Sequence, residues 1–243
     1  MKKTISKLFL VIGLIMVFAF TNVTAREYYY TNDNGVSLTK EEYDFLSKFY
    51  WDGYQEYMTI DQYNDFIEKD LMNGEFASDE TTDVDFITRG TEHTTSSKNL
   101  KISKTCLSSH CVVSITLTWL GNPSIRSWDV IGARFAGVSG LRNYYTSYYD
   151  SSTSFSASNY IIPGNGIGNS LDLADGSGII ISQTFDVNPG GTVYASYQHA
   201  VSNTTLAVSR DYTISSSGYG NVFLFGTAGR SIYDGMNGVS ITL

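Results

Sequence analysis

Hydrophobic and polar residues follow three different patterns along this chain of 243 residues. The first 25 residues join a basic start to a mostly apolar run, and residues 39–71 repeat apolar positions at helical spacing. From residue 99 onward, short stretches rich in apolar and β-branched residues are separated by turns containing glycine, asparagine or proline. The patterns predict a leader, a short helical segment and a β-rich body.

The leader has the order of a secretory signal peptide. Three lysines within the first seven residues precede an apolar run at 8–20 that only Gly13 interrupts, and small residues follow at 23–25. This order predicts cleavage after Ala25 and a secreted, extracellular mature chain. The alternative is a membrane anchor, but the run has 13 residues, whereas a spanning helix needs about 20. With no second apolar stretch downstream, we expect no stable membrane anchor.

Residues 26–76 are expected to form an acidic two-helix segment. Thr39 with Glu42, and Thr59 with Gln62, are spaced as capping boxes, in which two side chains satisfy free backbone N–H groups at a helix start. The turn between the helices is expected at 51–53, and Gly74 suits the end of the second helix. The apolar stripes are Tyr43, Leu46, Phe49 and Tyr50 in the first helix, then Ile60, Tyr63, Ile67 and Leu71, with Phe66 beside them.

Acidic charge is concentrated in this segment. Residues 26–86 hold 16 acidic and 4 basic side chains, whereas residues 87–243 hold 8 acidic and 9 basic ones. Nucleic acids and anionic lipids are negatively charged, so the segment is repelled by both. The β-rich body has no basic stripe, and we expect no nucleic-acid partner.

A calcium loop is an alternative interpretation just before the first helix. Asn32, Asn34, Gly35 and Glu41 have the spacing of an EF-hand loop, but Tyr30 occupies the position where such a loop needs aspartate. An Asn-Gly turn leading into the helix explains the same residues. The stretch 172–176 likewise fits a turn between strands, and we predict no metal site and no cofactor.

Residues 77–98 show no sustained periodicity and are expected to be a linker. The body at 99–243 is predicted to be an antiparallel β-sandwich, because many short strands alternate with turns. The sequence does not distinguish a jelly-roll from an immunoglobulin-like topology. The expected strands are 99–106, 111–120, 128–138, 158–162, 178–187, 191–201, 205–215, 220–226 and 238–243.

The two cysteines, Cys106 and Cys111, are expected to form a disulfide because the chain is exported. A four-residue loop between them would pair Ile102 with Ile115 and Leu100 with Leu117, which places the apolar residues of both strands on one face. A zinc site is the alternative, but two thiolates do not fill a tetrahedral shell, even with His110 nearby.

No catalytic constellation emerges from the sequence. There are three histidines, and no Gly-x-Ser-x-Gly elbow accompanies them. Only eight acidic residues follow position 86, several of them in predicted turns, so a carboxylate pair for glycan hydrolysis is not evident. The glycine-rich stretch 164–168 lacks the lysine of a phosphate-binding loop.

The strongest candidate for a binding surface is a tyrosine cluster that a serine-rich stretch follows. In a strand, Tyr144 and Tyr148 would share one face while Tyr145 and Tyr149 share the other, so we expect one pair in the core and the other exposed. Tyrosine with polar neighbours suits sugar stacking or a protein contact. The candidate ligand-binding residues are Arg142, Asn143, Tyr144, Tyr145, Tyr148 and Tyr149.

These observations favour a secreted, non-enzymatic protein that binds a glycan or a protein, for instance one on a cell surface. Two alternatives remain: a secreted glycan hydrolase, and a pore-forming or self-assembling β protein, because residues 154–156 alternate polar and apolar side chains. The sequence does not define the oligomeric state or the ligand.

Overall fold

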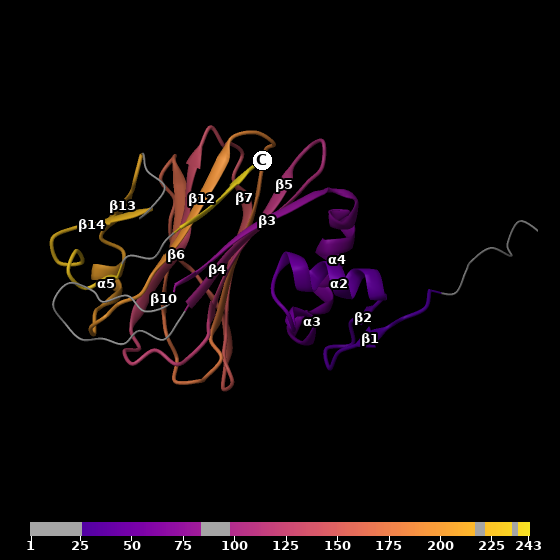
Figure 1. Ribbon diagram of the computed structural model, residues 1–243, viewed down its shortest axis with the longest axis horizontal. Helices are drawn as coiled ribbons and strands as arrows, with labels where there is room; N and C mark the ends of the chain where they lie inside the picture. Colours follow the sequence, from indigo (N-terminus) through magenta and orange to yellow (C-terminus); the bar gives the residue numbers. More distant parts are fainter. Residues whose placement is uncertain (1–25, 84–97, 217–221, 235–237) are drawn as a thin grey trace, which may run out of the picture.

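The computed structural model describes residues 26–83, 98–216, 222–234 and 238–243. Two antiparallel sheets face each other, and a helical segment formed by residues 26–74 covers the outer face of one of them (Figure 1). A smaller unit with the helix α5 covers the outer face of the other sheet. The mainly β, antiparallel class expected from the sequence is confirmed. The predicted signal peptide, residues 1–25, lies outside the described residues.

The first sheet has six strands in the order β3-β4-β5-β11-β7-β8. All neighbouring pairs are antiparallel, and an irregularity between Thr184 and Asp186 interrupts the pairing of β11 with β7. The strands are β3 Glu75–Asp83, β4 Lys98–Cys106, β5 Cys111–Trp119, β7 Arg142–Tyr149, β8 Ser154–Ala157 and β11 Ile180–Val187.

The second sheet has five strands in the order β15-β12-β6-β10-β9. Its strands are β6 Trp128–Ala136, β9 Asn159–Ile161, β10 Gly166–Asp172, β12 Thr192–Gln198 and β15 Val239–Thr242. One apolar cluster draws on both sheets: Ile115 and Phe185 come from the first, Ile131 and Tyr197 from the second, and all four are fully buried. This shared core makes the body sandwich-like.

The β4–β5 hairpin has the predicted register. Cys106 lies opposite Cys111, Ile102 opposite Ile115 and Leu100 opposite Leu117. The two cysteines form a disulfide, as expected. Alternation and cysteine spacing agree on one register, because a slip by one residue would turn one strand's apolar set away from the core.

The helical segment contains the helices α2 Lys40–Phe49, α3 Tyr54–Tyr57 and α4 Ile60–Glu68, followed by the 3₁₀ turn η1 Leu71–Asn73. Both predicted capping boxes form at Thr39 and Thr59. The predicted apolar stripe of the second helix is wrong in part, because Ile60 and Ile67 are exposed whereas Phe66 is buried. The helix ends at Glu68, so Leu71 is buried from the 3₁₀ turn, and α3 forms just after the expected turn.

The hairpin before α2 is an Asn-centred turn between β1 Tyr30–Thr31 and β2 Ser37–Leu38. The Asn32 side-chain oxygen accepts the backbone N–H groups of Asn34 and Val36, and its amide donates to the backbone oxygens of Gln55 and Met58. Asn32 therefore fixes the turn to α3.

The predicted linker is wrong for its first part, because residues 77–83 belong to β3, which pairs along the whole of β4. Residues 84–97 of that linker lie outside the described residues. The short helix α5, Leu206–Ser209, replaces the start of the strand expected at 205–215, and β13 Tyr212–Ile214 then pairs with β14 Phe223–Phe225. Strands β8 and β10 are absent from the expected strands, whereas β7 corresponds to the strand considered for the tyrosine cluster.

Strand β10 escaped prediction because two of its residues, Gly166 and Gly168, could not carry the usual apolar alternation. At Gly168, an added Cβ would lie 2.2 Å from the Tyr212 hydroxyl, and Gly168 pairs with Gly132 on β6. Glycine here allows the β13–β14 hairpin to approach the sheet closely. The glycine-rich stretch 164–168 thus contributes to an inner strand of the second sheet.

Candidate functional site

The outer face of the six-stranded sheet carries an unusual density of hydroxyl groups. One cross-strand row runs through Lys101, Thr116, Ser182, Ser147 and Ser156. An adjacent row joins Ser103, Ser114, Thr184 and Tyr145. Side chains in these rows point away from the core, because alternate residues such as Ile115 and Ile181 belong to it.

The helical segment packs on this polar face through a few apolar and aromatic contacts. Val112 and Tyr149 share a cluster with Leu46, Phe49 and Trp51 of the helical segment. Two hydrogen bonds pin the segment further, from Lys101 Nζ to the Lys48 backbone oxygen and from Thr105 Oγ1 to that of Leu71. Because this face of the sheet is largely polar, the helical segment does not pack closely against all of it.

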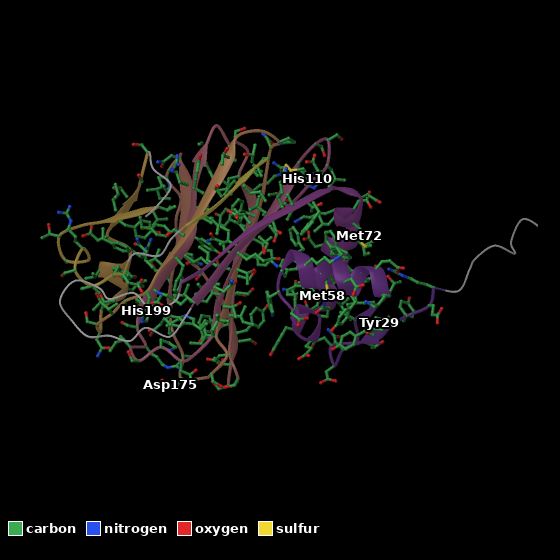
Figure 2. The ribbon with its side chains drawn as sticks, in the orientation of Figure 1. Tyr29, Met58, Met72, His110, Asp175 and His199 are labelled. Atoms are coloured by element: carbon green, nitrogen blue, oxygen red, sulfur yellow. A yellow bond between two sulfur atoms is a disulfide. The ribbon has the colours of Figure 1, made fainter. Side chains whose placement is uncertain are left out.

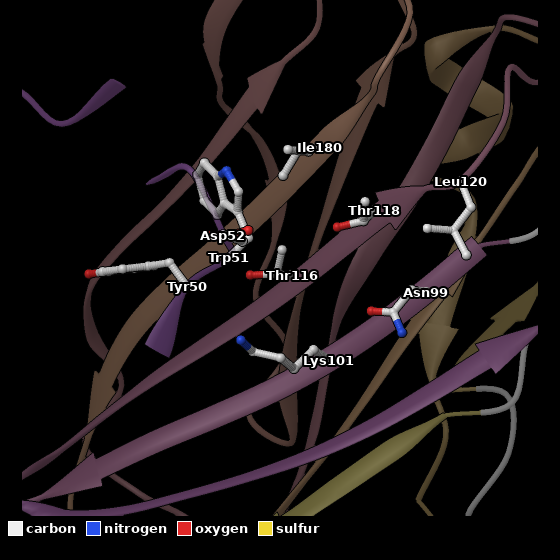
Figure 3. Close-up of a pocket in the computed structure, with 9 residues that line it drawn as sticks. All are labelled: Tyr50, Trp51, Asp52, Asn99, Lys101, Thr116, Thr118, Leu120 and Ile180. Carbon is white, nitrogen blue, oxygen red and sulfur yellow. The ribbon is translucent and has the colours of Figure 1, made fainter. Parts of the chain in front are cut away.

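A cavity of about 430 Å³ lies between the helical segment and this sheet. Figure 3 shows its wall of aromatic side chains from the helical segment and its floor of polar side chains from β4 and β5. The volume falls within the range of about 300–1,000 Å³ typical of small-molecule sites. Its lining residues are Tyr50, Trp51, Asp52, Asn99, Lys101, Thr116, Thr118, Leu120 and Ile180.

Two polar atoms at the cavity are buried without a hydrogen-bond partner. They are the indole Nε1 of Trp51 and the hydroxyl Oγ1 of Thr116. Trp51 is 6% exposed and Thr116 is 2% exposed. A buried polar group without a partner costs about 1–3 kcal/mol, so a hydrogen bond to either atom would recover part of that cost.

The tyrosines beside the cavity are neutral hydrogen-bonding groups. The Tyr50 and Tyr145 hydroxyls lie 3.5 Å apart, and the Tyr50 ring stacks on Tyr54 at a centroid distance of 4.0 Å. Burial raises the pKa of Tyr50 and of Tyr54 well above the ordinary value, and the Tyr145 hydroxyl contributes in both cases. These phenols therefore remain protonated at neutral pH.

The predicted tyrosine cluster is β7, and its side chains alternate as expected. Tyr148 is fully buried in the core between the sheets, and Tyr149 faces the helical segment. The expected exposed pair does not form. The helical segment covers Tyr145 and Tyr149 through Tyr50, Trp51 and Tyr57, and Tyr149 is only 8% exposed. Tyr144, which contacts Tyr160, is the most exposed of the four tyrosines at 40%.

Four of the candidate residues line two shallow depressions between α4 and β7. Asn143 has φ +49°, a left-handed conformation that asparagine tolerates, and it lies at the irregularity between β7 and β11. Its amide donates to Asp186, which also pairs with Lys69 at 3.2 Å. The four residues are Arg142, Asn143, Tyr144 and Tyr145.

Sequence reasoning missed the cavity residues. The sequence predicts a turn at Trp51, and it predicts a strand at Thr116 and Thr118 without indicating a functional role for either threonine. The available signal was the alternation along 112–118, where Ser114, Thr116 and Thr118 interleave with apolar residues and thereby define a polar face on the strand. That signal identifies the face but not the segment that covers it.

No protein-family model and no curated protein sequence matches the chain. Among solved structures, it is similar to the KRT10-binding region domain of the pneumococcal serine-rich repeat protein PsrP, with 11% identity, TM-score 0.34, and coverage of 51% of this chain and 86% of that one. It is also similar to a collagen-binding domain from a Staphylococcus aureus adhesin, with 11% identity, TM-score 0.29, and coverage of 40% and 81%.

A third similar structure comes from work on pH-induced modulation of Streptococcus parasanguinis adhesion by Fap1 fimbriae, with 13% identity, TM-score 0.36, and coverage of 68% of this chain and 95% of that one. All three are bacterial surface adhesin structures. Similarities at these scores decide neither the topology nor the function.

Within residues 26–83, 98–216, 222–234 and 238–243, no helix is long and apolar enough to cross a membrane.

Proposed function

We propose that this chain is a secreted, non-enzymatic binding protein that holds part of a glycan in the cavity between its helical segment and its six-stranded sheet. The observation that carries the proposal is that Trp51 and Thr116 both line this cavity, and each has a buried polar atom without a hydrogen-bond partner. A sugar ring offers hydroxyls for the indole N–H and the threonine, and apolar C–H faces for Tyr50, Trp51 or Leu120.

Charge at the cavity agrees with a neutral or weakly anionic sugar. Its lining has one ammonium group, that of Lys101, and one carboxylate, that of Asp52. A hydrolase would need two carboxylates flanking the scissile bond, and this lining supplies one. In the depressions near α4, Lys69 bridges Asp65 and Asp186 at 2.9 and 3.2 Å, so these acids are held as ion pairs.

A protein ligand is the second candidate, and it rests on a different surface. Tyr144 is 40% exposed beside the exposed Arg142 and Asn143. Tyrosine and arginine are the residues on which protein interfaces most often depend. The Tyr144→Ala variant separates the two candidates, because it would weaken a protein complex while leaving a sugar in the cavity untouched.

A glycan array probed with the labelled mature protein, residues 26–243, tests the proposal. We expect binding to a restricted set of saccharides, which weakens for Thr116→Val and persists for Tyr144→Ala. Absence of binding to every saccharide on the array contradicts the proposal. Cleavage of a bound saccharide would instead favour the hydrolase, and release of dye from liposomes would favour a pore-former.

A further inference from the structure

A buried pair of opposite charges lies away from the cavity, on the side of the first sheet that faces the second. Lys98 begins β4, and Asp234 precedes β15 by a few residues. The Lys98 ammonium contacts Asp234 Oδ2, and the two side chains are 3% and 0% exposed. Burial of both charges costs desolvation that an ion pair repays only in part, so the pair calls for a further explanation.

Aromatic rings enclose the amine. Lys98 Nζ lies 5.3 Å from the ring centroid of Trp119 and 5.8 Å from that of Tyr197. The Trp119 indole N–H donates to the Tyr197 hydroxyl at 3.2 Å, which fixes both rings. Both residues are almost completely buried, so this wall keeps bulk water from the amine.

The carboxyl group is held in a single orientation. The backbone N–H of His199 donates to Asp234 Oδ1 at 2.8 Å, and the Asp234 N–H donates back to the His199 oxygen at 3.0 Å. With Oδ1 engaged, Oδ2 is the oxygen that faces Lys98. In Figure 2, His199 lies on the far side of the molecule from the helical segment that contains Met58.

A second buried carboxylate positions this arrangement. Asp129 Oδ2 lies 2.9 Å from His199 Nδ1 and also accepts the Tyr197 hydroxyl, while Asp129 Oδ1 accepts the backbone N–H of Ala200. Asp129 thereby fixes the ring behind Lys98 and the strand end that carries the donor to Asp234. It acts through these groups, and we assign it a positioning role.

We propose that Lys98 and Asp234 condense to an intramolecular isopeptide bond. A proton passes from the Lys98 ammonium to Asp234 Oδ2, and the neutral amine attacks Asp234 Cγ to form the N–C bond. A second proton moves from that nitrogen to the same oxygen, the C–Oδ2 bond breaks, and one water molecule leaves. No oxidant, reductant or other reactant takes part, and an amide N–H remains on the former Lys98 nitrogen.

Three features of the site favour this step. The reacting groups are held in contact, which removes most of the entropic cost of bringing them together. The His199 N–H is aimed at Oδ1, the oxygen on which negative charge grows during attack. Exclusion of water from the product opposes hydrolysis, and a neutral amide replaces two buried charges. The bond would join residues that are 136 positions apart in sequence.

The intact mass of the mature secreted protein, measured under denaturing conditions, tests the proposal. We expect a mass lower than the sequence requires by one water molecule, in addition to the two hydrogen atoms lost to the disulfide. Proteolysis should release a branched peptide that joins the Lys98 and Asp234 segments. A protein that retains the full mass contradicts the proposal, whatever its ligand.

A matched variant excludes a trivial loss of water. Asp234 precedes Gly235, and an Asp-Gly step loses the same mass when the aspartate cyclises onto its own backbone. Lys98→Arg keeps the positive charge and has no primary amine that could condense. The water loss must disappear in this variant, since a loss that persists there would assign it to backbone cyclisation and overturn the isopeptide bond.

Discussion

The rings of Trp51 and Tyr149 lie 5.2 Å apart, centroid to centroid, and join the helical segment to strand β7. Tyr57 contacts the other side of the same tyrosine at 5.0 Å. Tyr149, one of the candidate ligand-binding tyrosines, is therefore the aromatic anchor beneath the helical segment. The cavity depends on this docking, because the helical segment supplies its aromatic wall.

Replacing Tyr149 should destabilise the protein far more than replacing Tyr144. Tyr149 is 8% exposed and packs on two rings, whereas Tyr144 is 40% exposed. We expect Tyr149→Ala to lower the free energy of unfolding by about 3 kcal/mol and Tyr144→Ala to lower it by less than about 1 kcal/mol. Urea unfolding followed by tryptophan fluorescence measures both. Equal losses would contradict the docking of the helical segment on Tyr149.

Thr116→Val should separate binding from stability. The Thr116 hydroxyl is buried without a partner, so its replacement by a methyl group of similar shape leaves the free energy of unfolding unchanged or raises it by up to about 1 kcal/mol. Saccharide affinity should nevertheless fall. Ser103→Ala is the control, because Ser103 has an equally buried hydroxyl without a partner on the same sheet face and does not line the cavity. If Ser103→Ala weakens binding as much, the assignment of Thr116 is wrong.

Stability should fall in acid in a way that depends on Asp150. Burial raises the pKa of Asp150, but hydrogen bonds from the Ser152 backbone and hydroxyl, the Tyr148 hydroxyl and the Thr153 backbone outweigh it and lower the pKa to about 2. Because the folded-state pKa lies below the unfolded one, the contribution of about 2 kcal/mol is present above about pH 4 and is lost as the pH falls towards 2.

The Asp150→Asn variant tests that contribution. Urea unfolding should show it to be less stable than the wild type by about 2 kcal/mol at pH 7, with a much smaller difference at pH 2. Asp175→Asn, a change at an exposed acid nearby in the fold, serves as the control and should behave alike at both values. A deficit for Asp150→Asn that is as large at pH 2 as at pH 7 would show that the carboxylate charge is not involved.

The disulfide should contribute modestly, because it closes a loop between residues only five positions apart. Chain-entropy reasoning gives about 2 kcal/mol for a loop of this length. The Cys106→Ala, Cys111→Ala double variant should lose about that amount in urea unfolding, and reduction of the wild type should have a similar effect. A loss several times larger would mean that the cysteines do more than restrict the unfolded chain.

Local signals in the sequence predicted the β4–β5 hairpin and both capping boxes. Apolar alternation and two cysteines fix the hairpin register, and side chains three residues apart fix each cap, so nothing distant is needed. Strand β10 was missed for the opposite reason. Gly166 and Gly168 are explained by what approaches them from β6 and from the β13–β14 hairpin, and those neighbours are remote in sequence.

The tyrosine cluster of β7 was predictable only as a strand with tyrosines on both faces. Which face would be covered depends on the helical segment, and its position is a tertiary property that periodicity does not encode. The cavity brings together residues 50–52, 99–101, 116–120 and 180, which no motif links. The contact of Lys98 with Asp234 spans most of the body and was invisible for the same reason.

The most direct test of the central claim is the affinity of an array-selected saccharide for Trp51→Phe, measured by calorimetry on the mature protein. This variant keeps an aromatic ring at the wall of the cavity but removes the indole N–H, which has no partner in the free protein. Trp128→Phe is the matched control, since Trp128 lies on β6 and does not line the cavity. We expect about tenfold weaker binding for Trp51→Phe and wild-type binding for Trp128→Phe. Equal affinities for the two variants would contradict a ligand site beneath the helical segment.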